Sequence, residues 1–211
     1  MTDAERVLAV LIHDVRTPLG VAHGYLRLVR TDKLPSPEDR ERALAGTQDA
    51  LAKISRLCQE AGGFLEDPRP GTARASARQL SERVAAVLAE RGVAVGALEP
   101  PEGSINVGTS MDRAAEAIAT LLSVRAGRTP GIVARIEAGG AALRFTCGPA
   151  GDGAAVPALD GEERPFDPWQ SPQALGVALA HRLVTALGGR VWTAGNGLAL
   201  ALAMPMESGN A

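Results

Sequence analysis

Cysteine is scarce in this chain, and long apolar runs and a strong excess of charge of one sign are absent. The two cysteines, Cys58 and Cys147, form neither a C-x-x-C pair nor a metal-ligand spacing, which predicts reduced cytoplasmic thiols and no metal site. No uninterrupted apolar run reaches about 18 residues, so no membrane span is expected. A net charge of −2 gives no general attraction to nucleic acid or to a membrane surface.

The N-terminal stretch MTDAERVLAVLIHD carries its acidic residues before its apolar run, which is the reverse of a secretion signal. Thr2 and Glu5 have the spacing of a capping box and predict the start of a helix. Apolar residues then recur at alternating steps of four and three, as in a heptad seam. The members of this seam are Leu8, Ile12, Val15, Leu19, Ala22, Leu26 and Val29.

Ser36 followed by Pro37 predicts the first residues of a second long helix. Its predicted seam contains Leu44, Thr47, Leu51, Ile54, Cys58, Ala61 and Leu65. Two seamed helices joined by a short loop form an antiparallel hairpin, and one hairpin cannot cover its own seam on all sides. The pattern therefore predicts that two copies pair into a homodimeric four-helix bundle.

The second half of the chain mixes short apolar runs with two further helical patterns. A stretch rich in proline, glycine and small residues predicts a linker between the halves. The expected elements are helices over 77–91, 109–126 and 172–189, strands over 103–108, 131–140 and 141–148, a loop over 148–171 and a closing hairpin over 190–205. The predicted domains are a hairpin over 1–66, a linker over 67–75, an α+β domain over 76–205 and a tail over 206–211.

His13 stands in the first helix beside an acid, in the stretch HDVRTPLG. With Ile12 on the seam, His13 points toward solvent, and Thr17 lies one turn further along the same face. Pro18 removes a backbone hydrogen bond and bends the helix beside the histidine. An exposed imidazole next to a carboxylate can act as a nucleophile, although the residue alone is also compatible with an ordinary surface histidine.

The whole stretch resembles the H-box of two-component sensor histidine kinases, since His13, Asp14, Thr17, Pro18 and Leu19 all match its pattern. The resemblance implies that His13 carries a phosphoryl group, that Asp14 assists proton transfer, and that Thr17 helps to position water during dephosphorylation of a response regulator. His23 and His181 are expected to be structural.

The C-terminal half resembles the ATP-binding domain of the same family. PFDPW (165–169) is similar to the F-box, and ALGVALAHRLVTALGGRVW is similar to the helix after the second glycine box. The residues expected to bind nucleotide are replaced: Thr120 and Val124 stand for the N-box asparagines, and Cys147 for the adenine-binding aspartate. The alternative frame at Asp152 has Ala154 and Val156 in place of glycines, the second glycine box keeps only Gly176, and the lid is two residues long.

The predicted fold class is therefore an α + α/β sandwich, with the helical hairpin followed by a degenerate histidine-kinase-type ATPase-like α+β domain. An intact H-box beside a degenerate ATP site predicts a histidine phosphotransferase that exchanges phosphoryl groups with receiver domains of response regulators. It needs no cofactor of its own, because Mg²⁺ is expected on the receiver. Arg16, Val15, Leu19 and Val21 are the predicted docking residues. The alternatives are a non-catalytic pseudokinase scaffold and a soluble ATP-dependent histidine kinase or phosphatase with a divergent pocket.

Overall fold

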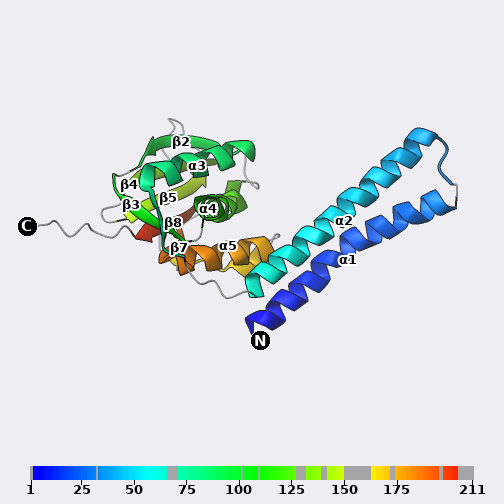
Figure 1. The fold of residues 1–211 in the computed structure, drawn as a ribbon, viewed down its shortest axis with the longest axis horizontal. Coiled ribbons are helices and arrows are strands. Elements are labelled where there is room, and N and C mark those ends of the chain that lie inside the picture. The colour runs from blue at the N-terminus through cyan, green and yellow to red at the C-terminus, as the bar shows by residue number, and fades with distance from the viewer. Residues whose placement is uncertain are drawn as a thin grey trace, which may run out of the picture. The chain divides into compact units, whose positions relative to one another are not determined.

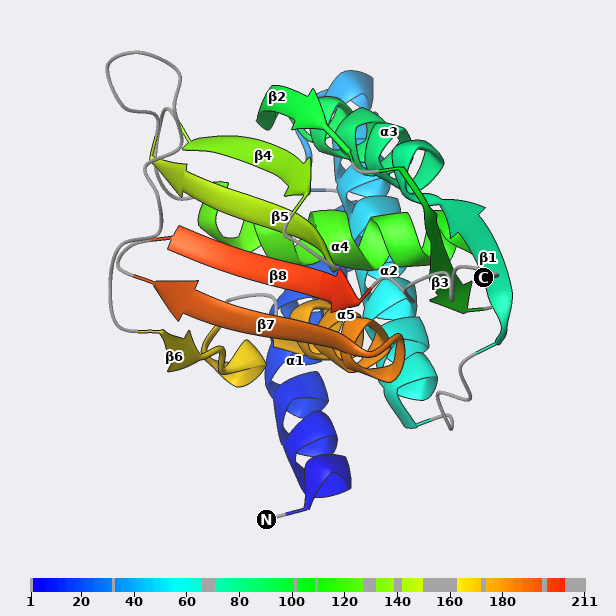
Figure 2. The ribbon, with the colours of Figure 1, turned by 90° about the vertical axis from the view of Figure 1, so that its left-hand side faces the viewer.

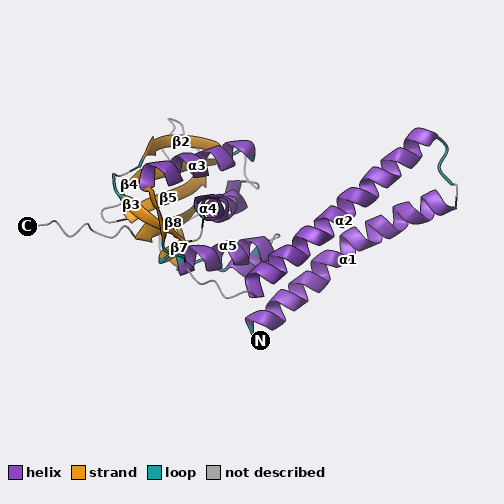
Figure 3. Ribbon diagram, viewed as in Figure 1, coloured by secondary structure: helices purple, strands orange, loops and turns teal. Residues whose placement is uncertain are grey.

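A computed structural model describes residues 2–31, 33–65, 71–100, 102–108, 110–126, 132–138, 142–149, 163–171, 174–194 and 197–203. The chain folds as two compact units, Met1–Asp67 and Pro68–Ala211. The first contains only helices, and the second combines helices with strands (Figures 1 and 3). The predicted tail 206–211 and residues 67–70 of the predicted linker lie outside the described residues. Within the described ranges, no helix has the length and apolar character needed to span a membrane.

The first unit is a hairpin of two long helices, α1 (Asp3–Arg30) and α2 (Pro37–Leu65). The predicted capping box at its start is present: the Glu5 N–H donates to the Thr2 side chain, and the Thr2 N–H donates to the Glu5 carboxylate. Ser36 accepts a hydrogen bond from the Asp39 N–H at 3.1 Å, which confirms it as the cap before Pro37. Both helices therefore begin where the sequence predicts.

The contact face between the two helices differs from the predicted seams. On α1 the buried residues are Val7, Pro18 and Ala22. On α2 they are Ala43, Thr47, Ala50, Leu57, Ala61 and Phe64, so most of the stripe lies one residue before the predicted one. Small side chains at four of these six positions let the helix backbones approach closely. The larger predicted residues Leu19 and Leu51 are instead 55% and 52% exposed.

The second unit is built on a six-stranded sheet of order β2-β4-β5-β8-β7-β6. Its strands are β2 (Ala94–Glu99), β4 (Ile132–Ala138), β5 (Ala142–Pro149), β6 (Arg164–Pro165), β7 (Gly189–Ala194) and β8 (Gly197–Ala203). All neighbours are antiparallel except β2 and β4, which are parallel. The predicted pairing of the strands now labelled β4 and β5, and the closing hairpin of β7 and β8, are confirmed.

Helices α3 (Ala77–Glu90), α4 (Met111–Ala126) and α5 (Ala174–Ala186) cover one face of this sheet (Figure 2). Alternate residues of the central strands point toward the helices, so that Leu143, Phe145 and Cys147 on β5 are fully buried in the core. The side chain of Asp112 on α4 accepts a hydrogen bond from Arg83 Nε on α3 at 2.7 Å. The buried residues of the three helices and of the central strands form one hydrophobic core.

Four short elements were not predicted from the sequence. Strand β1 (Ala73–Ser76) occupies the end of the predicted linker and pairs antiparallel with β3 (Ser104–Gly108). Strand β2 follows α3, where no strand was predicted. The predicted loop over 148–171 contains β6 and a 3₁₀ turn, η1 (Pro168–Gln170). The three strands are short and weakly patterned, so their neighbours in the sheets determine their conformation more than their own sequences do.

Replacing Gly189 by alanine should destabilise the second unit by about 3 kcal/mol, because no space exists for the added methyl group. A Cβ at this position would lie 2.6 Å from Val184 Cγ1 and 2.7 Å from the Val184 carbonyl oxygen, and a backbone atom cannot move aside. The measurement is denaturant unfolding followed by tryptophan fluorescence, since Trp169 and Trp192 both belong to this unit. A Gly62→Ala variant, whose added Cβ on α2 meets nothing within 4 Å, should leave this transition unchanged. Equal midpoints for Gly189→Ala and the wild type would contradict the prediction.

Candidate functional site

His13 projects from α1 into solvent, and its side chain is 86% exposed. Its Nδ1 lies 2.9 Å from Oδ1 of Asp14, the adjacent residue. An ionised carboxylate only accepts hydrogen bonds, so this contact favours the form of the ring with the proton on Nδ1. The lone pair of Nε2 then faces solvent and is available to an electrophile.

The carboxylate that holds the imidazole is itself partly sheltered by the hairpin. The Asp14 side chain is 24% exposed, and it lies on the side of α1 that turns toward α2, between the buried residues Val7 and Pro18. A partly buried Asp14 therefore anchors an exposed His13. Thr17 is exposed one turn beyond His13, and Arg16 is exposed as well.

The four predicted docking residues do not share one surface with His13. At 3.6 residues per turn, Val15 and Leu19 lie more than about 100° around the helix from His13, on the side that carries Ile12. Arg16 and Thr17 flank His13 on its two sides, and exposed Val21 lies beyond Thr17. The geometry thus places Val21 and Thr17 beside His13 and assigns Val15 and Leu19 to a different face.

One residue near His13 was missed by the sequence reasoning. Glu60 on α2 is half-buried, next to the buried residues Leu57, Ala61 and Phe64. Burial has the largest effect on its carboxyl group and raises the pKa. The Arg56 charge lowers this pKa and the Asp14 charge raises it, and the pKa of Glu60 is raised overall. The sequence signal for Glu60 was weak: it is an acidic residue next to Ala61, a member of the predicted seam.

In the second unit, Thr120 and Val124, which the sequence resemblance places at the N-box asparagines, have structural contacts. Val124 on α4 is partly buried and packs against the hydrophobic core. The Thr120 hydroxyl accepts a hydrogen bond from Arg91 Nη1 at 3.1 Å, and Arg91 also pairs with Glu116. Val124 offers no oxygen ligand, and the Thr120 hydroxyl is hydrogen-bonded to Arg91, the residue that follows α3.

Residues that the sequence resemblance places at the glycine boxes are also part of the apolar interior. Cys147 is fully buried on β5, while Leu175 and Val177, on either side of Gly176, are buried on α5. Asp152, Ala154, Val156 and Pro172 lie outside the described residues. Among the described residues, no group of His, Cys, Asp and Glu side chains could hold a metal ion.

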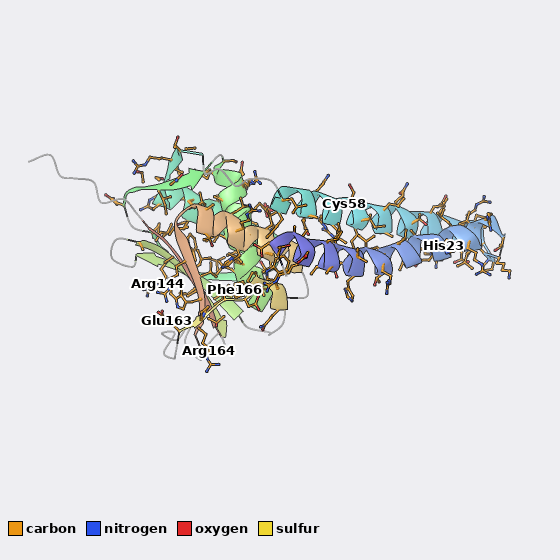
Figure 4. All side chains as sticks on the ribbon, turned by 90° about the horizontal axis from the view of Figure 1, so that it is seen from below. His23, Cys58, Arg144, Glu163, Arg164 and Phe166 are labelled. Atoms are coloured by element: carbon orange, nitrogen blue, oxygen red, sulfur yellow. The ribbon has the colours of Figure 1, made fainter. Side chains whose placement is uncertain are left out.

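The segment PFDPW (165–169), predicted to correspond to an F-box, contacts His181. The rings of Phe166 and His181 lie 5.9 Å apart with a tilt of 41°. Burial lowers the pKa of His181, and Asp167 offsets part of this effect. Glu163 of the same segment pairs with Arg190 of β7 at 2.5 Å, and Figure 4 shows Glu163, Arg164 and Phe166 gathered in this region. His181 is therefore held in packing contacts, whereas His23 on α1 is exposed.

No protein-family model and no curated protein matches the chain. Among solved structures, the histidine kinase AdeS of Acinetobacter baumannii matches 92% of this chain and 98% of its own, at 16% identity and a TM-score of 0.63. The histidine kinase ThkA, crystallised with the response regulator protein TrrA, matches 95% of this chain and 61% of its own, at 15% identity and a TM-score of 0.64. A bacterial phosphotransferase matches 95% of this chain with a TM-score of 0.43, which is too low to indicate a shared arrangement of the domains. The chain thus has the fold of histidine kinases, a helical hairpin followed by a small ATPase-like sheet domain.

Proposed function

We propose that the chain is a histidine phosphotransferase that exchanges a phosphoryl group with a receiver domain through His13. The observation that carries this proposal is the 86% exposed imidazole whose Nδ1 lies 2.9 Å from the Asp14 carboxylate. This contact orients the ring and favours the proton on Nδ1. The remaining nitrogen, Nε2, then has both the lone pair and the solvent access that a nucleophile needs.

In the transfer, the Nε2 lone pair of His13 attacks the phosphorus of the receiver's phosphoaspartate. The N–P bond forms while the bond between phosphorus and the aspartate oxygen breaks, and the electron pair leaves with that oxygen as a carboxylate. Asp14 stabilises the positive charge that develops on the imidazole. In-line geometry and charge stabilisation carry most of the catalysis, and the reverse reaction phosphorylates the receiver. The Mg²⁺ ion belongs to the receiver.

The second unit supports a role without ATP chemistry. Val124 packs against the core where a metal-ligating asparagine is expected, and Cys147 is buried where an adenine-binding aspartate is expected. Leu175 and Val177 are buried at the second glycine box, where a Cβ obstructs the approach of backbone N–H groups to phosphate. We therefore propose that this unit does not bind ATP and serves the hairpin as a scaffold.

A receiver domain is the proposed partner, which is supported by the fold likeness to ThkA, a kinase crystallised with a response regulator. The exposed guanidinium of Arg16 would attract the acidic receiver site. Val21 supplies exposed apolar surface beyond Thr17. Thr17 would position water for hydrolysis when the protein acts as a phosphatase.

A homodimer is the proposed assembly. Leu8, Ile12, Leu19 and Leu26 form an exposed stripe on α1, and Leu44, Leu51, Cys58 and Leu65 form one on α2. Each stripe lies about 90° around its helix from the hairpin contact face, in the same rotational sense. Because the helices are antiparallel, both stripes lie on one side of the hairpin, here called the seam face. An apolar face of this extent supports burial against a second copy.

An ATP-dependent histidine kinase is the second candidate, and the fold likeness to AdeS and ThkA favours it. The two functions differ in the source of the phosphoryl group. A kinase takes it from ATP with Mg²⁺ bound in the second unit, whereas the phosphotransferase takes it only from a receiver. A pseudokinase scaffold would accept no phosphoryl group from either source.

The test offers the full chain two phosphoryl donors in parallel. One is radiolabelled ATP with Mg²⁺, and the other is a panel of receiver domains from the same genome, each labelled on its aspartate. We expect label on His13 from a receiver and none from ATP, and calorimetry at millimolar ATP and Mg²⁺ should show no saturable heat. Label from ATP, or micromolar ATP affinity, would establish the kinase instead, and label from neither donor would favour the scaffold.

A further inference from the structure

The contact between Tyr25 and Gly46 gives the register of the hairpin. A Cβ built on Gly46 would lie 2.5 Å from the Tyr25 ring, so these two residues face each other across the helices. In an antiparallel pair, moving eleven residues back from Tyr25 corresponds to moving eleven residues forward from Gly46. Because helical side chains lean toward the N-terminus of their own helix, this contact sets the register to about one turn and places Asp14 opposite the part of α2 that carries Leu57. Glu60 follows on this part of α2, and the Asp14 charge acts on its carboxyl group.

Asp14 and Glu60 also lie on the same side of the hairpin. On each helix they are displaced from the contact face in the sense opposite to the seam face, as are His13 and Thr17. Both carboxylates are partly sheltered: the Asp14 side chain is 24% exposed, and Glu60 is half-buried next to Leu57 and Phe64. The face that presents His13 thus receives one carboxylate from α1 and one from α2.

The charges around Glu60 come from both helices. Arg56, on the same helix, favours the ionised carboxylate, while Asp14, on the opposite helix, disfavours it. Burial is the largest influence and raises the pKa of Glu60. Two sheltered carboxylates near each other repel when both are ionised, so the charge on Glu60 acts on the carboxylate that holds His13.

We propose that Glu60 is a positioning residue for His13, acting through Asp14. An ionised Glu60 repels the Asp14 carboxylate toward Nδ1 of His13, which strengthens the hydrogen bond that leaves Nε2 as the nucleophile. A protonated Glu60 donates its O–H toward Asp14 and weakens the hydrogen bond between Asp14 and Nδ1 of His13. This inference rests on the proposed function of His13 and adds a second helix to the site.

The variant Glu60→Gln keeps the shape of the side chain and removes its charge. We expect the ring ¹⁵N chemical shifts of His13 to move toward the form with the proton on Nε2, and the transfer rate from a phosphorylated receiver to fall roughly fivefold. The wild-type rate should rise more steeply with pH than the variant rate, because Glu60 ionises above the ordinary range of a glutamate. Glu60→Asp should restore part of both properties.

Two controls separate positioning from folding. Glu41→Gln removes an exposed charge from the same helix and should change neither the His13 shifts nor the rate. A raised folded-state pKa means that folding stability falls as pH rises through that pKa, so Glu60→Gln should be at least as stable as the wild type at neutral pH. Thermal unfolding checks this expectation.

A double-mutant cycle with Asp14→Asn gives the decisive result. If Glu60 acts through Asp14, Glu60→Gln has no further effect in the Asp14→Asn background. Two results would overturn the proposal. One is an equal effect of Glu60→Gln in both backgrounds, and the other is that Glu60→Gln leaves the ring ¹⁵N chemical shifts of His13 the same as Glu41→Gln does. The ring ¹⁵N shifts require no phosphoryl donor, so this inference can fail or stand even if no receiver labels His13.

Discussion

The His13→Ala protein should accept no phosphoryl group from a labelled receiver, a loss of transfer below detection, while it keeps its helical content and its assembly state. The reason is chemical: the methyl group of alanine has no lone pair to attack phosphorus, and neither Asp14 nor Thr17 can replace the imidazole. The measurement is the radiolabel on the purified chain after a short incubation with the receiver. Circular dichroism and light scattering on the same sample report the fold.

The chain provides its own matched control for this experiment. His23 is also exposed on α1 (Figure 4), and His23→Ala removes an imidazole from the same helix without changing the stretch HDVRTPLG. Its label should equal that of the wild type.

Asp14→Ala should slow transfer without abolishing it, and Thr17→Ala should affect net dephosphorylation more than transfer. Undiminished relay by His13→Ala would remove the phosphotransferase proposal and leave the scaffold.

Placing an aspartate on the seam face should dissociate the proposed homodimer. Leu19 and Leu51 are 55% and 52% exposed in one hairpin, and the proposed bundle buries them. Leu19→Asp or Leu51→Asp would bury an unpaired charge on each copy, and we expect the dissociation constant to rise at least about 100-fold. Light scattering over a range of micromolar concentrations should show a wild-type dimer and monomeric variants.

A leucine outside the seam face tests the assignment of that face. Leu28 is an exposed residue of α1 on the opposite side, so Leu28→Asp introduces the same charge without meeting the proposed partner. It should leave the dimer intact. A wild-type monomer at micromolar concentration would contradict the bundle, and dissociation by Leu28→Asp would place the interface on another face.

The strongest sequence patterns led to correct predictions of the hairpin and of the central sheet hairpins. The capping box at Thr2 and the Ser36-Pro37 pair depend on a few neighbouring residues, so local chemistry determines them. The predicted seams do not form the contact within the hairpin, because a heptad pattern shows which residues are apolar but not which partner buries them. The alanines that form the true contact on α2 carry little hydrophobic signal.

Part of the candidate site was accessible from the sequence. His13, Asp14 and Thr17 are close in sequence and share one or two helical turns, so a motif contains them. Glu60 is 46 residues from Asp14 and enters the site only when the hairpin closes. Val15 and Leu19 were predicted to belong to the docking surface of the bundle, and helical rotation places them on a different face of α1 from His13.

Burial of Pro18 and Ala22 against α2 has a consequence for local unfolding. The segment from Pro18 to Gly24 is intrinsically poor at forming helix: relative to alanine, the proline costs about 3 kcal/mol and each of Gly20 and Gly24 costs about 1 kcal/mol. A Cβ at either glycine would meet nothing within 4 Å, so no close packing within the chain requires them. Contact with α2, and not intrinsic helix propensity, therefore keeps residues 18–24 helical. If α1 separated from α2, α1 would unwind first just beyond His13, so the cooperativity of the hairpin is tied to the geometry of the His13 imidazole.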